Sequence, residues 1–282
     1  MSSDTQKTKP PACIACGLRF RGISATRIIL WLGAITLVSF AIGFGILALS
    51  GDFPSASGHD LSPFRQGSTL VPNTTTVPLD GATAGDVKLT IGAGELTLQG
   101  GAPDNALMEA TIFSPAAEWQ PELSQTLNAS RKSVTLTGKG HTGKEWFAVD
   151  PPNSWDIDLN NKIPIRLDVT VGAGDCLVSL GSLNLESLSV HNGAGDTTVD
   201  LGGYHGGRFD AVIKNGIGDL TLRIPRDSNT RIQVQNGIGD IRDGHGLVQD
   251  HDTYVTDGFN ASLAVNEITL NQGVGSISLE TV

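Results

Sequence analysis

The sequence predicts an all-β protein: a β-solenoid of stacked strand–Gly-x-Gly–strand repeats, preceded by one transmembrane helix. Three observations support this prediction. A Gly-x-Gly tripeptide recurs six times, apolar and polar residues alternate on both sides of each copy, and an uncharged apolar run occupies residues 28–49. Together they divide the chain into an N-terminal membrane-associated part and a C-terminal repeat domain.

The Gly-x-Gly copies recur with a nearly constant period. Four of them begin at residues 172, 193, 216 and 237, so successive copies lie 21, 23 and 21 residues apart. Self-similarity with a period of about 20 to 50 residues is typical of stacked-repeat proteins. The predicted corner glycines are Gly92, Gly94, Gly172, Gly174, Gly193, Gly195, Gly216, Gly218, Gly237, Gly239, Gly273 and Gly275.

The flanks of each copy predict two strands joined at a corner. In the copy at 193, Leu188 and Val190 precede the glycines and Val199 follows them, with polar residues between. An apolar residue at every second position indicates a strand with one buried face. Glycine suits the corner because it lacks a Cβ and tolerates positive φ and close backbone packing. A dinucleotide-binding loop would need a helix directly after the glycines, whereas strand-like runs such as DLTLRI follow here.

An amide side chain stands directly before the first glycine in four successive copies. By the alternation this position faces the core, where an amide without a partner would cost about 1–3 kcal/mol. Stacked coils lie about 4.8 Å apart, so equivalent amides could hydrogen-bond to one another. We therefore predict an amide ladder formed by Asn192, Asn215, Asn236 and Gln272.

An acidic residue follows the second glycine in five copies: Glu95 in the first, and then Asp175, Asp196, Asp219 and Asp240. Coils in register would align these carboxylates in a column, where like charges repel unless they are hydrogen-bonded or bridged by a cation. Each carboxylate could accept backbone N–H groups at its own turn, or the column could hold calcium. The spacing differs from the nine-residue calcium repeat of secreted toxins, which favours the turn interpretation.

The three cysteines predict little chemistry. Cys13 and Cys16 form a Cys-x-x-Cys that supplies two of the four ligands that zinc needs. A zinc site there would require a dimer or a partner protein, and we favour a reduced, unmetallated pair. Cys176 occupies an inward strand position and is expected to be a buried small hydrophobe. We expect no cofactor, with calcium and zinc as the alternatives.

The apolar run is long enough to cross a bilayer. Small residues at its end also fit a cleaved signal peptide, but the run is longer than a usual signal core. Basic residues before the run and acidic residues after it place the N-terminus in the cytoplasm. The expected parts are a cytoplasmic tail with the CxxC at 1–27, a transmembrane helix at 28–49, an extracytoplasmic stalk at 50–83 and the solenoid at 84–282.

The charge distribution limits the partners of the exterior domain. The whole chain carries a net charge of −10, and a tail of +4 leaves −14 on the remainder. An acidic exterior domain argues against nucleic acid as a partner and against docking on anionic lipid. The expected partners are the membrane itself and an envelope polymer or a membrane signalling protein.

Residues 119–201 resemble a known family. The matching motifs are Trp-x-Pro at Trp119, the segment NSWDIDL around Trp155, and the serial Gly-Ala-Gly-Asp corners. Together they are similar to the toast-rack domain of bacterial and archaeal membrane proteins, which is related to Lia-type envelope-stress regulators and to adhesin-like β-solenoids. The resemblance covers about residues 84–282 and implies a β-solenoid outside the membrane, without established catalytic residues. Lia-type proteins usually carry several membrane spans, whereas this chain shows one.

These observations favour a non-enzymatic, membrane-anchored extracytoplasmic scaffold, adhesin or envelope-sensing protein that binds through its solenoid. The alternative is a regulatory subunit of an envelope-stress signalling complex. A polysaccharide-active enzyme is a remote alternative, since no convergent acid–base group is visible. The segment RDGHGLVQDHD at 242–252 contains aspartates and histidines that could hold a metal, but the same residues are typical of an exposed loop.

Overall fold

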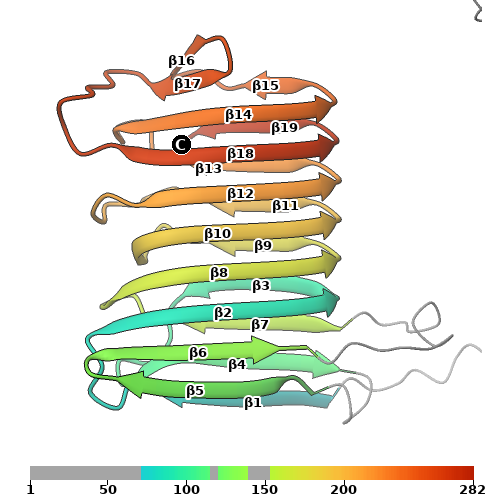
Figure 1. The fold of residues 1–282 in the computed structure, drawn as a ribbon, viewed down its shortest axis with the longest axis vertical. Helices are drawn as coiled ribbons and strands as arrows, with labels where there is room; N and C mark the ends of the chain where they lie inside the picture. The colour runs from blue at the N-terminus through green and yellow to red at the C-terminus, as the bar shows by residue number, and fades with distance from the viewer. Residues whose placement is uncertain (1–70, 115–119, 139–152) are drawn as a thin grey trace, which may run out of the picture. The chain divides into compact units, whose positions relative to one another are not determined.

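The computed structural model describes residues 71–114, 120–138 and 153–282. They lie within one compact unit, Gln66–Val282. Every regular element in these ranges is a β-strand, as the alternation of apolar and polar residues predicts (Figure 1). The transmembrane helix expected at 28–49 and the tail at 1–27 lie outside the described residues. Among the residues that are described, no helix has the length and hydropathy of a membrane span.

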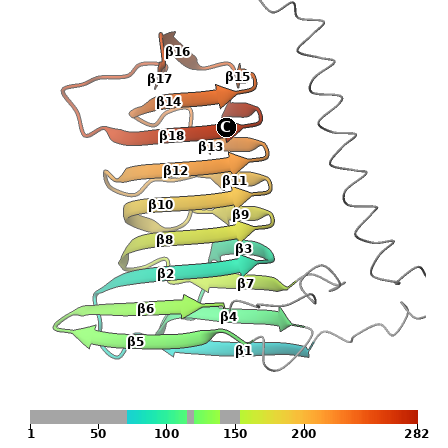
Figure 2. The ribbon, with the colours of Figure 1, turned by 45° about the vertical axis from the view of Figure 1, so that its right-hand side comes forward.

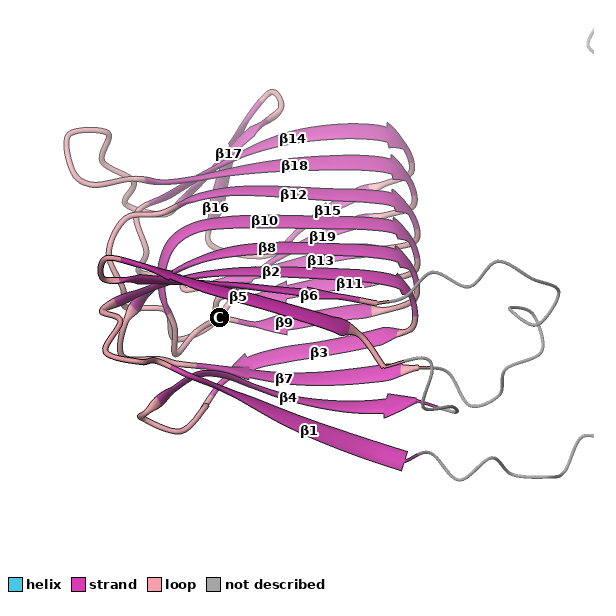
Figure 3. Ribbon diagram, turned by 60° about the horizontal axis from the view of Figure 1, so that its bottom comes forward, coloured by secondary structure: helices cyan, strands magenta, loops and turns pink. Residues whose placement is uncertain are grey.

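The strands form two sheets that face one another (Figure 3). In spatial order, sheet A contains β1 (Val71–Pro78), β4 (Ala106–Ser114), β7 (Ser154–Leu159), β3 (Glu95–Gly100), β9 (Cys176–Ser179), β11 (Thr197–Asp200), β13 (Leu220–Ile224), β19 (Ile277–Thr281) and β15 (Ile241–Asp243). Sheet B contains β5 (Glu122–Asn128), β6 (Arg131–Thr137), β2 (Ala84–Ala93), β8 (Pro164–Ala173), β10 (Asn184–Ala194), β12 (Asp210–Ile217), β18 (Asn266–Val274), β14 (Thr230–Ile238), β17 (Thr253–Thr256) and β16 (Leu247–Asp250).

The repeating unit is a coil, made of one strand of sheet B and the strand of sheet A that follows it in the chain. Along the stack the coils are β6/β7, β2/β3, β8/β9, β10/β11, β12/β13, β18/β19 and β14/β15 (Figure 2). Strands of neighbouring coils run parallel, and equivalent residues pair across them, as Asn192 pairs with Asn215. The predicted solenoid of strand–corner–strand repeats is therefore present.

The order of the coils along the stack differs from their order in the sequence. Coil β18/β19, the last in the chain, lies between β12/β13 and β14/β15. As a result Gln272 pairs with Asn215 on one side and with Asn236 on the other. The two NGIGD copies are consecutive in the sequence but are not adjacent in space. Equivalent corners have the same hydrogen-bonding edges, so the sequence alone does not encode which coils are neighbours.

Both ends of the stack depart from the parallel repeat. At one end β5 is antiparallel to β6, and β4 is antiparallel to both β7 and β1. Val71–Pro78, which the sequence analysis assigned to the stalk at 50–83, is therefore the edge strand of sheet A. The sequence analysis missed this strand because it contains two prolines. Proline cannot donate a hydrogen bond to the strand ladder and is tolerated in strands mainly at sheet edges. At the other end the antiparallel hairpin β16–β17 covers part of β14.

One hydrophobic core fills the space between the sheets. Most residues predicted to face inward are buried, including Val190 and Leu222, which are both fully buried. Trp155, from the NSWDIDL motif, is also fully buried within this core. The terminal coil differs: Ile241 and Asp243, which share the inward phase, are exposed. No further coil covers them in the described part of the chain.

The corner glycines allow neighbouring coils to approach closely. The second glycine of each corner has a positive φ, between +129° and +143°, a conformation that residues with a Cβ rarely adopt. The first glycine of each corner does not have a positive φ; at most corners it is required because the backbone of the neighbouring coil leaves no room for a Cβ. A Cβ on Gly193 would collide with the carbonyl oxygen of Gly172, and a Cβ on Gly216 would collide with that of Gly193. The predicted structural role of the corner glycines is therefore supported by their geometry.

Gly193→Ala should lower the free energy of unfolding by about 1–3 kcal/mol, because the added methyl group overpacks a backbone contact that cannot move aside. Gly92→Ala is the matched control, since Gly92 occupies the same corner position but no atom of the described residues lies within 4 Å of its would-be Cβ. We expect the control to change stability by less than about 0.5 kcal/mol. Urea denaturation followed by circular dichroism measures both. Equal losses in the two variants would show that close coil packing does not require the first glycine.

Candidate binding surfaces

The carboxylates of the corner acids form hydrogen bonds between coils. Asp175 Oδ1 accepts the backbone N–H of Asp196 at 3.0 Å, and Asp196 Oδ1 accepts that of Asp219 at 2.8 Å. Asp219 Oδ1 in turn accepts the N–H of Ser276 at 2.8 Å. These aspartates therefore align as a column, but each bonds to the next coil and not to its own turn. Asp240 does not adjoin Asp219, because the coil that carries Ser276 lies between them.

The corner amides face inward, but their hydrogen bonds do not run from amide to amide. Asn192 Nδ2 donates to Thr197 Oγ1 at 3.0 Å, and the Thr197 hydroxyl donates to Asn215 Oδ1 at 3.2 Å. Gly218 O then accepts from Asn215 Nδ2 at 3.0 Å and from Gln272 Nε2 at 2.6 Å. The predicted ladder is therefore corrected to a network in which a hydroxyl and a backbone carbonyl connect the amides of neighbouring coils.

The asparagines also serve their own corners. Each of Asn192, Asn215 and Asn236 donates to the carbonyl of the glycine three residues later, at 2.7–3.2 Å. Because the chain turns at the second glycine, the carbonyl of that glycine is not part of the regular strand ladder. The asparagine side chain donates the hydrogen bond that this carbonyl would otherwise lack. This local demand explains why an amide recurs at this position, and the sequence pattern alone did not distinguish it from amide stacking.

The described residues contain no group of three or more His, Cys, Asp or Glu side chains that could hold a metal ion. The corner column offers a single carboxylate per coil, and one oxygen of Asp175, Asp196 and Asp219 is already engaged. Calcium usually takes about six to eight oxygen ligands. The column is thus better suited to hydrogen bonding between coils, and calcium binding stays an untested prediction.

We expect the melting temperature of the full-length chain to be the same in millimolar calcium and in EDTA, because Asp175, Asp196 and Asp219 already accept backbone N–H groups and Asp240 stands apart from them. The measurement is differential scanning fluorimetry on the native chain and on a variant in which Asp196, Asp219 and Asp240 are changed together to Asn. A calcium-dependent rise that disappears in the triple variant would instead establish the column as a cation site.

Cys176 has the buried role that its position predicts. Its side chain is 1% exposed, and burial raises the pKa of the thiol to about 12. The thiol therefore stays protonated at physiological pH, and only the thiolate is nucleophilic or metal-binding. Cys13 and Cys16, the candidate zinc ligands, lie outside the described residues.

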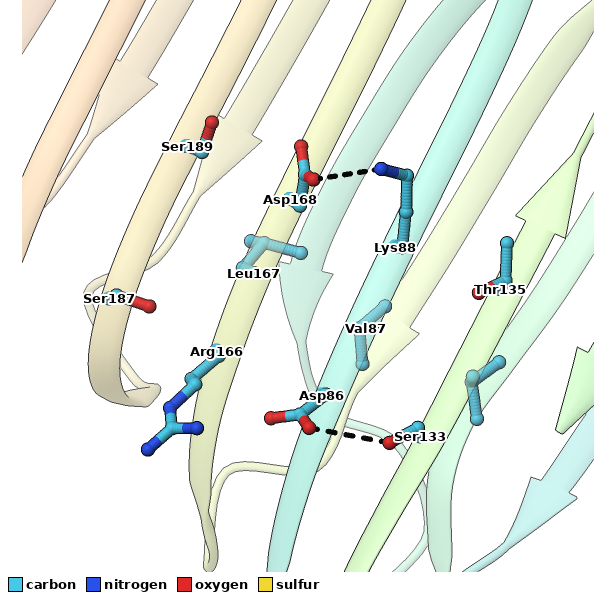
Figure 4. Close-up of a pocket in the computed structure, with 11 residues that line it drawn as sticks. Asp86, Val87, Lys88, Ser133, Thr135, Arg166, Leu167, Asp168, Ser187 and Ser189 are labelled. Atoms are coloured by element: carbon cyan, nitrogen blue, oxygen red, sulfur yellow. Dashed lines mark hydrogen bonds and ion pairs between the residues drawn. The ribbon is translucent and has the colours of Figure 1, made fainter. Parts of the chain in front are cut away.

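The outer face of sheet B carries a polar groove that the sequence analysis did not identify (Figure 4). It is a shallow depression of about 380 Å³ that crosses β6, β2, β8 and β10. Outward side chains form its two rims, and the backbone between them forms its floor. The rim side chains are Ser133, Asp86, Arg166 and Ser187 on one side and Thr135, Lys88, Asp168 and Ser189 on the other.

Charges in and beside the groove are paired across strands. Lys88 Nζ lies 3.2 Å from Asp168 Oδ2, and both side chains are about half exposed. Arg166 Nε lies 2.8 Å from a carboxylate oxygen of Glu186. Exposed pairs of this kind contribute about 0–1 kcal/mol to stability, so their arrangement does little to hold the fold. The groove therefore presents alternating charges and hydroxyl groups with almost no net charge.

A more buried arginine anchors one end of the groove. Arg131 at the start of β6 contacts Asp86 at 2.8 Å and Glu186 at 2.9 Å. Burial alone lowers the pKa of Arg131, but hydrogen bonds to Glu186 and Asp86 outweigh it and raise the pKa. The permanently charged guanidinium thus joins three strands and fixes the two carboxylates in place.

Sequence reasoning missed the groove because its residues come together only through coil order. β6 and β2 are neighbours, although about 40 residues separate them in the chain. The sequence did contain one signal, in the residues that the alternation places on the outer face. Asp86 and Arg166 occupy equivalent outward positions with opposite charges, and so do Lys88 and Asp168. Aligning the repeats by their corners would have paired those four residues, but not Ser133 or Arg131.

Two further polar regions lie outside the groove. On sheet A a depression of about 410 Å³ is lined by Asp156 and Asp158 of β7, and Gln99 Nε2 donates to Asp158 at 2.9 Å. The aspartate- and histidine-rich segment at 242–252 contributes to β15, β16 and the following turn, where His251 and Asp250 are almost fully exposed. The segment therefore lies on the surface at the end of the stack, as expected for an exposed loop.

Comparisons with known proteins agree with this architecture. A family model described as "N-terminal domain of toast_rack, DUF2154" matches residues 66–223, which is more than half of the chain. The matched region begins before the expected solenoid boundary at residue 84 and includes strand β1. A comparison with the curated proteins returns no match.

A solved structure shares the fold. A "putative cell adhesion protein" from Clostridium sporogenes superposes with a TM-score of 0.69 and 23% identity, over 76% of this chain and 100% of that one. At this identity the likeness shows the fold alone. A "putative adhesin" from Bacteroides fragilis is 11% identical over 74% of this chain and 96% of its own, with a TM-score of 0.28, which is too low to show a shared fold.

Proposed function

This chain belongs to the toast-rack family, and from that membership we propose that it is a non-enzymatic extracytoplasmic protein, adhesin-like or envelope-sensing, anchored by residues 28–49. It would bind a polar envelope polymer through the outer face of its solenoid. The observation that carries the proposal is the groove on sheet B, a shallow depression across four strands whose rims are polar side chains.

The chemistry of the groove favours a hydroxyl-rich polymer. Ser133, Thr135, Ser187 and Ser189 offer hydroxyl groups, and the charged pairs between them can donate to or accept from polar groups. A shallow trough that crosses parallel strands suits an extended chain better than a compact small molecule, since ligands of the latter kind are usually enclosed by an apolar pocket. The C. sporogenes structure, whose name refers to cell adhesion, is consistent with such a role.

A binding function accounts for the groove better than catalysis does. The carboxylates of Asp168 and Glu186 are each held by a cationic partner at 2.8–3.2 Å. A general acid or base needs a group free to exchange a proton near the operating pH. Paired, largely solvated charges are instead typical of a recognition surface, where they set orientation and specificity.

The double variant Lys88→Ser/Arg166→Ser tests the groove. We expect it to fold normally but to bind an insoluble cell-wall fraction about thirtyfold more weakly, because each of the two lost charged hydrogen bonds removes about 1 kcal/mol of binding free energy. Arg223→Ser, on a partly exposed pair with Glu280 on sheet A, is the matched control. Pull-down of the full-length chain with purified cell walls measures retention, and equal retention of all three proteins would refute the groove as the binding site.

Removing residues 1–26 separates this proposal from a signalling role. We expect the truncated chain to retain binding to the cell-wall fraction, because the groove lies wholly within the folded unit. The readouts are the same pull-down and cross-linking of the chain in its native membranes. Loss of a recurrent membrane partner together with loss of a stress response would favour the regulatory-subunit alternative, in which the basic tail is the functional element.

A further inference from the structure

Backbone hydrogen bonds at the corners all point in one direction along the stack. Gly195 N–H donates to the carbonyl of Ile217 in the next coil, and Thr197 N–H donates to that of Asp219, both at 2.8 Å. The same two bonds join every pair of neighbouring Gly-x-Gly corners, at 2.8–3.0 Å. Each coil therefore offers donors to the coil that lies nearer the β14/β15 end, and the aspartate column accepts N–H groups from that same side.

The last corner repeats this arrangement without a further coil. The equivalent donors are Gly239 N–H and Ile241 N–H, and the equivalent acceptor is the carboxylate of Asp240. Because β14/β15 ends the coil order, these groups face away from the stack. In the described part of the chain, no corner follows that could supply their partners. Three hydrogen-bonding groups in the spacing of the repeat are thus left open on one short surface.

The core is also open at this end. Ile241 is 37% exposed, whereas the apolar residues at the same position in the interior coils, such as Leu220 and Ile277, are fully buried. The corner residue Ile238 is 71% exposed, but Ile217 at the same position of an interior coil is also 61% exposed, so Ile241 is the residue that distinguishes this end. Exposed apolar side chains that adjoin unpaired strand edges are typical of surfaces that accept another strand.

On the sheet B side the capping hairpin stops before the corner. Strand β17 pairs with β14 over Arg231–Gln233, and Val234 N–H donates to the carbonyl of Asp252 at 2.8 Å, so β14 has no strand neighbour on that side beyond Val234. A hollow of about 480 Å³ lies there, between Gly237 and the hairpin turn at Asp252. The side-chain oxygens of Asn236 and Gln272 are buried without a hydrogen-bond partner, but so is that of Asn192 in an interior coil, so this feature does not distinguish the end of the stack.

The contacts of the interior corners define what could dock in the same register. A Cβ on the second glycine of a coil collides with the carbonyl of the preceding second glycine, as Gly275 shows against Gly218 and Gly239 against Gly275. A segment that stacks on Gly237 and Gly239 must therefore carry glycine at both corner positions. This steric rule makes the surface selective for the repeat motif itself.

The negative charge of this surface favours a docking segment with basic side chains. Between residues 240 and 257 the chain carries five aspartates and one arginine. Asp240, Asp250 and Asp252 are exposed, so a docking segment with basic side chains would be attracted and an acidic one repelled. A second copy of this acidic domain is a poor match by the same argument.

We infer that the β14/β15 end is a docking site for one more coil, supplied by a partner polypeptide as an extended segment with a Gly-x-Gly corner and basic flanking residues. The segment would continue the interface that the interior coils already form, adding backbone hydrogen bonds to the edge by strand addition. This site is separate from the groove on sheet B, so it does not depend on the polymer-binding function.

The test uses the full-length chain in mild detergent and three capped synthetic decapeptides. The first, IKNGIGKLTL, copies residues 213–222 with lysine in place of Asp219. The second replaces its second corner glycine with alanine, and the third replaces both lysines with glutamate. We expect the first to bind at least about tenfold more tightly than either of the others, by fluorescence anisotropy, and to slow amide hydrogen exchange at Gly239 and Ile241.

Variants of the chain locate the site. Asp240→Ala should weaken the first peptide about tenfold, whereas the control Asp210→Ala, an exposed aspartate on the outer face of sheet B, should leave its binding unchanged. Ile241→Pro, which removes one open donor at an edge where proline is tolerated, should weaken binding as well.

Three results would overturn the proposal. The first is equal affinity for the glycine and alanine peptides, and the second is binding that Asp240→Ala leaves unaltered. The third is exchange protection at Ile241 that appears without peptide as protein concentration rises, with a doubled mass in light scattering, because a second copy of this chain would then occupy the end.

Discussion

The close approach of one corner backbone to the next is the constraint on which the structure depends. Strands in a sheet lie about 4.8 Å apart, and at the corners this leaves no room for a Cβ between Gly193 and Gly172 or between Gly195 and Gly174. Once both positions are glycine, each corner N–H reaches a carbonyl of the next coil at 2.8–3.0 Å. Corners held in this way place both sheets in register, and the outer faces follow from that register.

The opposite side of each coil is under no such constraint. There the connections differ in length, from the short turn at 160–163 to the long segment at 257–265. This asymmetry explains why the corner motif is nearly invariant while its spacing varies. It also explains how the last coil in the sequence can occupy an interior place in the stack: a long connection on the unconstrained side spans the distance, and the corner fits any neighbour of the same kind.

The parts of the fold that could be predicted are those encoded within a single repeat. The strands, their inward residues and the glycine corners are local patterns, and the structure has them where the sequence indicated. Adjacency between coils is not local. The place of β18/β19, the strand at Val71–Pro78 and the groove around Asp86 and Arg166 all depend on which strands meet, and identical corners carry no information about that choice. The prediction of amide-to-amide hydrogen bonds was wrong for a related reason. The carbonyl of Gly218 accepts from Asn215 and Gln272, so these two amides do not bond to each other.

A stack whose corner backbone bonds all point one way has two chemically different ends, and the two ends of this protein are built differently. At the first end, antiparallel strands β5 and β4 replace the repeat and terminate it, as capping units do in repeat proteins. At the last end a hairpin covers one sheet beside Arg231–Gln233, while β15 ends the other after three residues. Short, charged edges of this kind resist indiscriminate pairing, yet the corner beside them keeps its donors, its carboxylate and its glycines. This end therefore excludes most strands but still matches the protein's own repeat. Its steric and charge requirements reject all segments except those that resemble another coil.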